Sequence, residues 1–300
     1  MKTELSILIP VYNYDCTQLA GDLCRQMVGL VAKDMRIELI VADDGSDDAL
    51  CLQANEQLAS LPHCRYIRRE ANVGRAAIRN YLAQQSQYEW LLFLDCDMEL
   101  PNEEFLHSYM ESDGDEVVDG GVSILSNPSM MGRNLRYSYE WSEQSRHAVD
   151  QRRANPHRSF RTTNFMVRRD IMLAHPFDER FVHYGYEDVL FGKELKRCRV
   201  GISHIDNPTV LTDLESNAVF VAKTEESLRT LHTFRSELRG YSRLLTFVEG
   251  IHIGAIRYGL RLWHALFGSL ERRNLCGSRP CLRVFKLYKL GYYLSLTNND

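Results

Sequence analysis

Asp95 and Asp97 are the first residues in this sequence whose types and spacing suggest chemistry. They follow the apolar run 91–94 and precede Pro101. A short apolar run bounded by turn residues predicts a buried strand, so both carboxylates should emerge where that strand ends. Magnesium prefers carboxylate oxygens and takes further ligands from substrate phosphates. The segment therefore predicts a site for a divalent cation and a diphosphate, and a solvated acidic turn is the alternative.

The first hundred residues must position these carboxylates, and they alternate short apolar runs with helical patterns. Alternation of this kind predicts a mostly parallel sheet with helices on both faces, an α/β fold. Ligands of such sheets bind beyond the carboxyl ends of the strands. Asn13, the pair Asp43 and Asp44, and the pair Asp95 and Asp97 all follow predicted strands, so three polar turns should converge on one edge. We expect strands at 5–11, 37–42, 65–67 and 91–94, and helices at 17–33, 48–60 and 74–85.

The remaining pattern is less regular. We expect strands at 117–125 and 163–167 and helices at 187–198 and 223–239. Residues 130–161 are rich in arginine and aromatic residues and predict a long loop or a loose helix. Guanidinium groups suit phosphate, so this segment could close over a diphosphate, and a solvated basic surface is the alternative.

Composition is that of a soluble globular protein, with 44% hydrophobic and 25% charged residues among 300. The net charge of −4 gives no indication of nucleic-acid binding. None of the eight cysteines forms a Cys-x-x-Cys pair, which favours free thiols in a reducing cytosol. The N-terminus lacks the pattern of a signal peptide, and no run of 18 apolar residues occurs. We therefore expect a cytoplasmic protein without a membrane-spanning segment, and peripheral attachment to the inner face of the membrane stays open as an alternative.

The C-terminal residues 241–300 differ from the rest of the chain. They hold nine Lys or Arg and three acids, a charge of +6, so the remainder carries −10. Residues 243–272 are amphipathic at the helical period, with charged residues within an arc of about 140° and apolar residues opposite. Three alternatives stay open: the helix packs on the body of the protein, it lies on an anionic membrane, or it forms a homodimer.

Five segments together resemble a family 2 glycosyltransferase with the GT-A fold over roughly residues 4–240. They are SILIPVYN, ELIVADDGSDD, NVGRAAIRN, FLDCDMELP and FDERFVHYGYEDVLFGKEL. The resemblance implies a GT-A domain at residues 1–240, followed by a basic amphipathic helical region at 241–300. It implies an inverting hexosyl- or N-acetylhexosaminyltransferase that takes a nucleotide-sugar donor, a UDP-sugar above all. The acceptor would be a hydroxyl of a glycan or of a lipid-linked molecule.

The resemblance also assigns roles on the donor side. Asp97 would bind Mn²⁺ or Mg²⁺, which bridges the diphosphate, and Asp95 would reach the ribose or the waters of the metal. Asp44 would accept the N3–H of uracil, and Asp43 would cap the turn or help to position Asp44. Arg79 would contact the base or a phosphate, with an exposed helix arginine as the alternative. The first loop would hold the base through Pro10 and Tyr12.

On the acceptor side, the resemblance assigns the general base to Asp188, because an attacking hydroxyl must lose its proton. Glu187 would orient this base or contact the acceptor, and Tyr186 could stack on a sugar. An acid stabilised by the helix dipole is the alternative for both carboxylates. Asn164 sits where relatives line the donor-sugar pocket, and hydrogen bonding at the edge of the core is its alternative.

One departure concerns a histidine that joins the metal in many relatives. Leu211 stands in its place, followed by Thr212 and Asp213, so Asp213 could substitute or the metal could rely on Asp97, phosphates and water. We expect His204 to be structural. The missing histidine gives some support to a non-catalytic nucleotide-sugar-binding or scaffold protein on the same fold. A sugar nucleotidylyltransferase is disfavoured, because residues 8–16 lack a glycine-, arginine- and lysine-rich loop.

Overall fold

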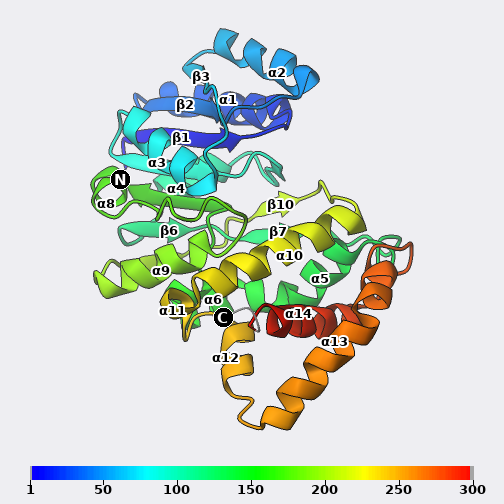
Figure 1. Cartoon of the computed structure of the whole chain (residues 1–300). Helices are drawn as coiled ribbons and strands as arrows, with labels where there is room; N and C mark the ends of the chain where they lie inside the picture. Colours follow the sequence, from blue (N-terminus) through cyan, green and yellow to red (C-terminus); the bar gives the residue numbers. More distant parts are fainter. Residues whose placement is uncertain (1, 298–300) are drawn as a thin grey trace. The chain divides into compact units, whose positions relative to one another are not determined.

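The computed structural model describes residues 2–297, and the chain divides into two compact units (Figure 1). The first unit comprises Met1–Ser123, Arg146–Val182 and Phe191–Asp213. The second comprises Ile124–Ser145, His183–Leu190 and Leu214–Asp300. The domain boundary predicted at residue 240 remains a prediction, since the division by contacts follows other limits.

A seven-stranded sheet forms the centre of the first unit, with the order β3-β2-β1-β4-β8-β6-β9. Its β1 is parallel to β2 and β4, β2 is parallel to β3, and β6 is parallel to β9. Only β8 runs antiparallel to its neighbours β4 and β6. The predicted mostly parallel α/β sheet is therefore confirmed. The strands are β1 (Glu4–Val11), β2 (Arg36–Asp43), β3 (Cys64–Arg68), β4 (Trp90–Leu94), β6 (Val117–Asp119), β8 (Asn164–Arg168) and β9 (Ile202–His204).

A second, three-stranded sheet has the order β5-β10-β7, formed by β5 (Met98–Glu99), β10 (Thr209–Leu211) and β7 (Val122–Ile124). The single strand predicted at 117–125 is wrong, because the chain breaks into β6 and β7 at Gly120 and Gly121. Gly121 has φ +88°, which favours glycine. A Cβ on Gly120 would lie 2.3 Å from the Tyr109 hydroxyl, so the backbone passes too close for any side chain.

Helices cover both faces of the seven-stranded sheet. Side chains of β1 alternate between the faces: Ile7 and Ile9 pack with α1 and α4, whereas Leu8 packs with α3 and α8. The β strands are therefore buried on both sides, as continuous apolar runs require. The helices around this sheet are α1 (Thr17–Val31), α2 (Ala49–Glu56), η1 (Gln57–Ser60), α3 (Arg75–Gln85), α4 (Phe105–Met110), α6 (Val149–Ala154), α7 (Pro156–Ser159), α8 (Arg169–Ala174) and α9 (Glu187–Arg197).

The second unit is helical and has its own apolar core, which includes Leu135, Val221 and Phe285. The loop or loose helix expected at 130–161 is in fact α5, η2, α6 and α7. Asn134 explains where α5 starts, because its side chain accepts a hydrogen bond from the backbone N–H of Tyr137. The remaining elements are α5 (Leu135–Glu143), η2 (Gln144–His147), α10 (Asn217–Thr233), α11 (Arg235–Leu238), α12 (Arg243–Glu249), α13 (Gly254–Leu275) and α14 (Leu282–Leu296).

The amphipathic stretch predicted at 243–272 is two helices, α12 and α13, separated by residues 250–253. Within residues 2–297, none of the helices combines the length and the hydropathy needed to cross a bilayer.

Candidate active site

The turns after β1 and β2 are joined by Asn13. Its Oδ1 accepts hydrogen bonds from the backbone N–H groups of Asp47 and Asp48, both at 3.0 Å, and its Nδ2 donates to Asp47. Asn13 has φ +48°, a left-handed conformation that asparagine tolerates. The backbone N–H of Asp44 also donates to Val11 O at 2.8 Å. The predicted convergence of these two polar turns is therefore confirmed.

Asp43 organises the second turn, as one of its predicted roles required. Its Oδ1 accepts from the Ser46 N–H at 2.7 Å, and its Oδ2 accepts from the Tyr66 hydroxyl at 2.9 Å. Gly45 completes the turn with φ +75°, and a Cβ there would lie 2.5 Å from the carbonyl carbon of Ala71. Asp43 is fully buried, so it does not contact a ligand.

Asp44 binds the start of α3. Its carboxylate accepts the N–H groups of Val73 and Gly74, with Gly74 at 3.0 Å from Oδ2. Only 4% of the residue is exposed, and burial raises the pKa of Asp44, opposed by these two N–H groups. An ionised carboxylate offers about four lone-pair sites, so one on Oδ1 remains for a further donor.

Arg79 and Asp95 form an ion pair at the carboxyl end of β4. Arg79 is on α3 and 1% exposed, and its Nη2 donates to Oδ1 of Asp95 at 2.7 Å. Its guanidinium also lies over the ring of Phe177, 5.8 Å from the centroid. The alternative of an exposed helix arginine is wrong. A buried guanidinium thus holds the first carboxylate of the Asp95-Cys96-Asp97 turn in place.

Asp97 lies near Tyr14, which the sequence did not single out, and near Asp213, which was expected as a possible substitute for the missing histidine. Burial raises the pKa of the Tyr14 phenol, and the nearby charges of Asp213 and Asp97 raise it further. Asp213 is exposed and Asp97 is half-buried. Tyr14 follows Asn13 in the first loop, and that position was the only signal in the sequence that could have indicated it.

These donors fit a hard divalent cation. Among the described residues, no cluster of three or more His, Cys, Asp or Glu could hold a metal ion. Magnesium sites at phosphates commonly use only one or two carboxylates, with phosphate oxygens and waters filling the other positions. Asp97 and Asp213 supply oxygen donors of this type near the Tyr14 phenol. Leu211, which replaces the expected histidine, is 4% exposed and pairs with Met98 in the small sheet.

The first loop presents an aromatic ring to solvent. Tyr12 is 47% exposed, and the neighbouring Pro10 at the end of β1 is half-buried. Pro10 lies in register with Ala42 of β2, one residue before the Asp43-Asp44 pair. An exposed ring beside this turn could stack on a base.

Asn164 lies in the core at the start of β8. It is 1% exposed, its Oδ1 accepts from the Tyr109 hydroxyl at 2.7 Å, and its Nδ2 donates to the carbonyls of Gly121 and Asn207, both at 2.9 Å. These contacts favour the alternative of hydrogen bonding at the edge of the core. We therefore leave Asn164 out of the candidate site.

Arg152 is structural, although it belongs to the segment that could have closed over a diphosphate. It is 4% exposed and binds Asp119 Oδ1 at 2.9 Å, the carbonyl of Ile205 at 2.8 Å and Nδ1 of His204 at 3.0 Å. His204 is 3% exposed, and its Nε2 lies 3.0 Å from Pro156 O. The structural role predicted for His204 is confirmed, and the buried Asp119–Arg152 pair was missed by sequence reasoning.

The residues predicted for the acceptor side belong to the second unit. Glu187 and Asp188 form the first turn of α9, where the helix dipole favours negative charge. Glu187 is 7% exposed, whereas Asp188 is half-buried and its Oδ1 accepts from the N–H of Val189 at 2.7 Å. Burial raises the pKa of Tyr186, whose backbone has φ +70°. The roles of these residues stay predictions.

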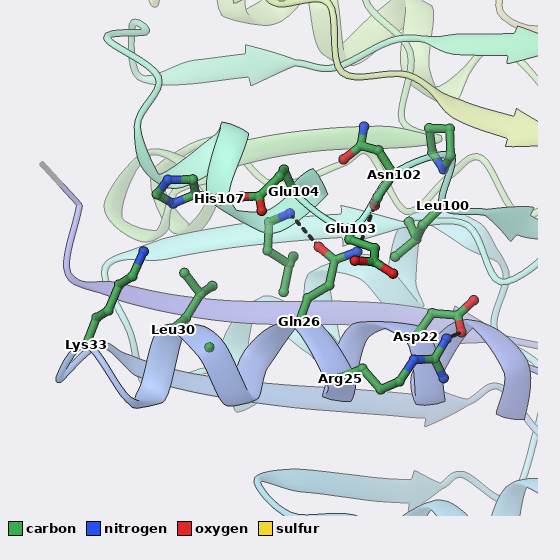
Figure 2. Close-up of a pocket in the computed structure, with 13 residues that line it drawn as sticks. Asp22, Arg25, Gln26, Leu30, Lys33, Leu100, Asn102, Glu103, Glu104 and His107 are labelled. Carbon is green, nitrogen blue, oxygen red and sulfur yellow. Dashed lines mark hydrogen bonds and ion pairs between the residues drawn. The ribbon is translucent and has the colours of Figure 1, made fainter.

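A cavity of about 570 Å³ lies elsewhere in the first unit, between α1 and the segment after β5 (Figure 2). Asp22, Arg25 and Gln26 line it from α1 and Lys33 from the turn that follows, opposite Glu104 and His107. Gln26 bridges the two sides, because its Nε2 donates to Asn102 O and its Oε1 accepts from Leu106 N. No predicted site residue lines this cavity, so it is distinct from the candidate active site.

The fold is similar to that of solved GT-A glycosyltransferases. S. aureus TarS 1–349 in complex with UDP-GlcNAc is 17% identical, with a TM-score of 0.51 over 100% of this chain and 92% of that chain. The mannosyltransferase PcManGT from Pyrobaculum calidifontis, in complex with GDP-Man and Mn²⁺, is 11% identical, with a TM-score of 0.54 over 100% and 89%. Fold and carboxylate turns thus define the GT-A class.

The chain belongs to glycosyl transferase family 2, whose model matches residues 6–174. Among characterised proteins, it is similar to chondroitin synthase from Escherichia coli, with 28% identity over 230 residues. This match covers 64% of the present chain but 32% of chondroitin synthase, so the chain spans about a third of that relative.

Proposed function

We propose that this chain is an inverting, metal-dependent glycosyltransferase that moves a sugar from a UDP-sugar to a hydroxyl of a glycan or lipid-linked acceptor. The observation that carries the proposal is the set of acids at the carboxyl ends of β2 and β4. Asp44 has one lone pair left that can accept a hydrogen bond, and Asp95 is held in place by its hydrogen bond from Arg79. Asp97 and Asp213 both lie near the Tyr14 phenol. Family membership and the UDP-GlcNAc complex of a protein with a similar fold support this choice.

The uracil of the donor would bind beside the loops that Asn13 joins. The remaining lone pair on Oδ1 of Asp44 would accept the N3–H of the base, while Tyr12 would stack on its face. Tyr12 is exposed and offers a free ring face, and stacking of this kind is worth about 1–3 kcal/mol per base in nucleic-acid complexes. Cytosine lacks the N3–H, so the pairing selects uridine over cytidine.

Asp97, with Asp213 as a second donor, would hold a divalent cation. When bound, such a cation neutralises the charge that grows on the leaving nucleoside diphosphate. Asp95 would bind the ribose, and Arg79 would keep its carboxylate in that orientation through the 2.7 Å hydrogen bond. Loss of Arg79 would therefore misplace the donor as well as weaken the fold.

Asp188 would be the general base. It would take the proton of the acceptor hydroxyl as the hydroxyl oxygen bonds to the anomeric carbon and the bond to the diphosphate oxygen breaks. A single displacement inverts the anomeric configuration. The support for Asp188 is its motif and its place in the first turn of α9, where it is more exposed than Glu187. Glu187 would position it.

Thermal shift measurements with UDP, CDP and GDP, each with and without Mn²⁺, test the donor side. A ligand that binds the native state stabilises it by about 2.7 kcal/mol at a hundred times its dissociation constant. We expect UDP with Mn²⁺ to raise the midpoint most, and Asp97→Asn to remove the part that depends on Mn²⁺. Asp34→Asn is the matched control, since Asp34 is an exposed turn residue with φ +60°, a conformation that asparagine accepts.

Equal shifts with UDP and CDP would contradict the role of Asp44, and an Mn²⁺ effect that survives in Asp97→Asn would contradict the metal site. The non-catalytic alternative predicts the same binding, so it must be separated by turnover. Release of UDP from a UDP-sugar measures turnover directly. Binding without release of UDP, even with mixed acceptors, would favour a nucleotide-sugar-binding protein.

A further inference from the structure

Helix α13 packs with its polar side. It lies beside α14 in the second unit (Figure 1), and the residues that face inward include Arg257, Arg261, His264 and Glu271. Arg261 Nε donates to Leu294 O at 3.0 Å, and Arg257 binds the carbonyls of Val248 and Ile251 at 2.9 and 2.8 Å. The charged residues of α13 are thus used to cap and bridge neighbouring segments.

The apolar side of α13 faces solvent instead. Its side chains are between 39% and 67% exposed, and we call them the apolar face: Tyr258, Leu262, Trp263, Leu266, Phe267 and Leu270. At 100° per residue they cover about half of the helix circumference. Helix α13 therefore packs on α14 and α10 through its polar side, and its apolar face stays uncovered among the described residues.

The apolar face is large for a surface in water. Six residues that are each about half exposed present on the order of 600 Å², at roughly 200 Å² per large side chain. Ile253 and Phe247, at 60% and 59% exposure, extend it toward α12. The largest apolar patch of a typical monomer is about 300–600 Å², and larger patches mark sites of interaction.

Charge identifies the occupant. Within residues 250–297 the only acid is Glu271, which is 7% exposed and accepts a hydrogen bond from the Trp263 indole at 2.8 Å. The exposed charges of this stretch are all positive; Arg272 pairs with Glu225 of α10 at 2.8 Å, and the others are Arg273, Arg279, Arg283 and Lys286. A two-fold interface would bring like charges near each other, because it pairs the same patch with itself. An anionic lipid surface complements them.

We propose that the apolar face of α13 docks on an anionic membrane surface, with the helix in the plane of the interface. Leu262, Leu266 and Phe267 enter the boundary between headgroups and acyl chains, as amphipathic helices with aromatic and aliphatic faces do. Tyr258 suits that depth, since it joins an apolar ring to a polar atom. Arg273, Arg279, Arg283 and Lys286 then contact the phosphates. This docking does not depend on the donor or on the catalytic base.

Vesicle flotation of the full chain tests the proposal. We expect binding to vesicles of phosphatidylcholine mixed with phosphatidylglycerol and much weaker binding to phosphatidylcholine alone. The variant Leu262→Glu, Leu266→Glu, Leu270→Glu should lose at least about tenfold in affinity, because three charged groups would have to enter an apolar layer. The matched control is Leu50→Glu on α2, which is 78% exposed and should bind as the wild type does.

Two further readouts keep the outcome clear. Circular dichroism should be unchanged in the triple variant, since the three leucines are exposed. Trp263 fluorescence should shift to the blue with anionic vesicles, and Trp263→Phe should remove the shift although Trp90 and Trp141 remain. The proposal is overturned if the wild type fails to float, or if the triple variant floats as well as the control. It is also overturned if the wild type has no affinity for vesicles but is a dimer in solution, and the triple variant is a monomer.

Discussion

Replacement of Arg79 by methionine should destabilise the protein and impair donor binding together. Arg79 and Asp95 are joined at 2.7 Å, with side chains 1% and 18% exposed. Methionine keeps much of the volume but removes the charge, so Asp95 stays at a largely buried position without its cation.

The magnitude follows from the geometry. At an effective dielectric constant of about 20, unit charges at this separation attract by roughly 6 kcal/mol, and most of this offsets their desolvation. Removing one partner of a buried pair costs about 3–5 kcal/mol. Because water reaches part of Asp95, we expect about 3 kcal/mol. In the double variant Arg79→Met, Asp95→Asn, the coupling between the two changes should be about 1–3 kcal/mol.

Urea unfolding gives the free energy of each variant, and UDP titration gives the affinity. Arg25→Met is the matched control, since Arg25 also pairs with an acid, Asp22, but its side chain is 73% exposed. Exposed pairs contribute about 0–1 kcal/mol, so this change should be nearly silent. If Arg79→Met costs no more than Arg25→Met, or if its effect adds to that of Asp95→Asn without coupling, the ion pair does not hold this turn.

Three other changes separate parts of the site. Gly74→Ala should lower the free energy of unfolding in urea by about 2 kcal/mol, because Gly74 has φ +91° and a Cβ would lie 2.9 Å from Val182 O. The control Gly29→Ala in α1 has nothing near its Cβ and should raise that free energy by about 0.5–1 kcal/mol. Equal effects of the two changes would contradict a strained backbone at Gly74. Burial raises the pKa of Asp44 above 3.8, so the native state retains its proton longer and stability falls as pH rises from about 4 through the native pKa. Asp44→Asn should remove that fall in stability. If the free energy of unfolding of Asp44→Asn depends on pH in the same way as that of the wild type, Asp44 is not the group responsible. Asp213→Asn should raise the Mn²⁺ concentration needed for half-maximal UDP release about tenfold, and an unchanged Mn²⁺ requirement would leave Asp97 as the sole protein ligand.

The sequence predicted the elements that hold the candidate site best. β1, β2 and β4 are largely apolar runs that end in polar turns, so both their existence and the convergence of the first two turns followed from period and composition. Asp43 was expected to cap its turn, and it does. The direction of β8 could not be predicted, because Asn164–Arg168 has the same apolar pattern whether it runs parallel or antiparallel to β4.

Other features depend on contacts between distant segments. The short strands β5, β9 and β10 have two or three residues each, too few to show a period. The Asp119–Arg152 pair joins residues 33 apart, and Arg152 looks like any other arginine of its segment. The amphipathic pattern of α13 was evident, but which side packs inward was not. Its arginines donate to backbone carbonyls of α12 and α14, so the polar side of α13 packs inward, whereas an amphipathic helix usually packs with its apolar side.

Release of UDP from a UDP-sugar by Asp188→Asn tests the central claim most directly. Asparagine keeps the size of the side chain but cannot take the acceptor proton, so turnover should fall by 10²–10⁴ while the thermal shift with UDP and Mn²⁺ stays unchanged. Glu194→Gln on the same helix is the control, since Glu194 forms an exposed pair with Arg197 and should retain full turnover. If Asp188→Asn turns over as fast as the wild type, a base at this position is refuted.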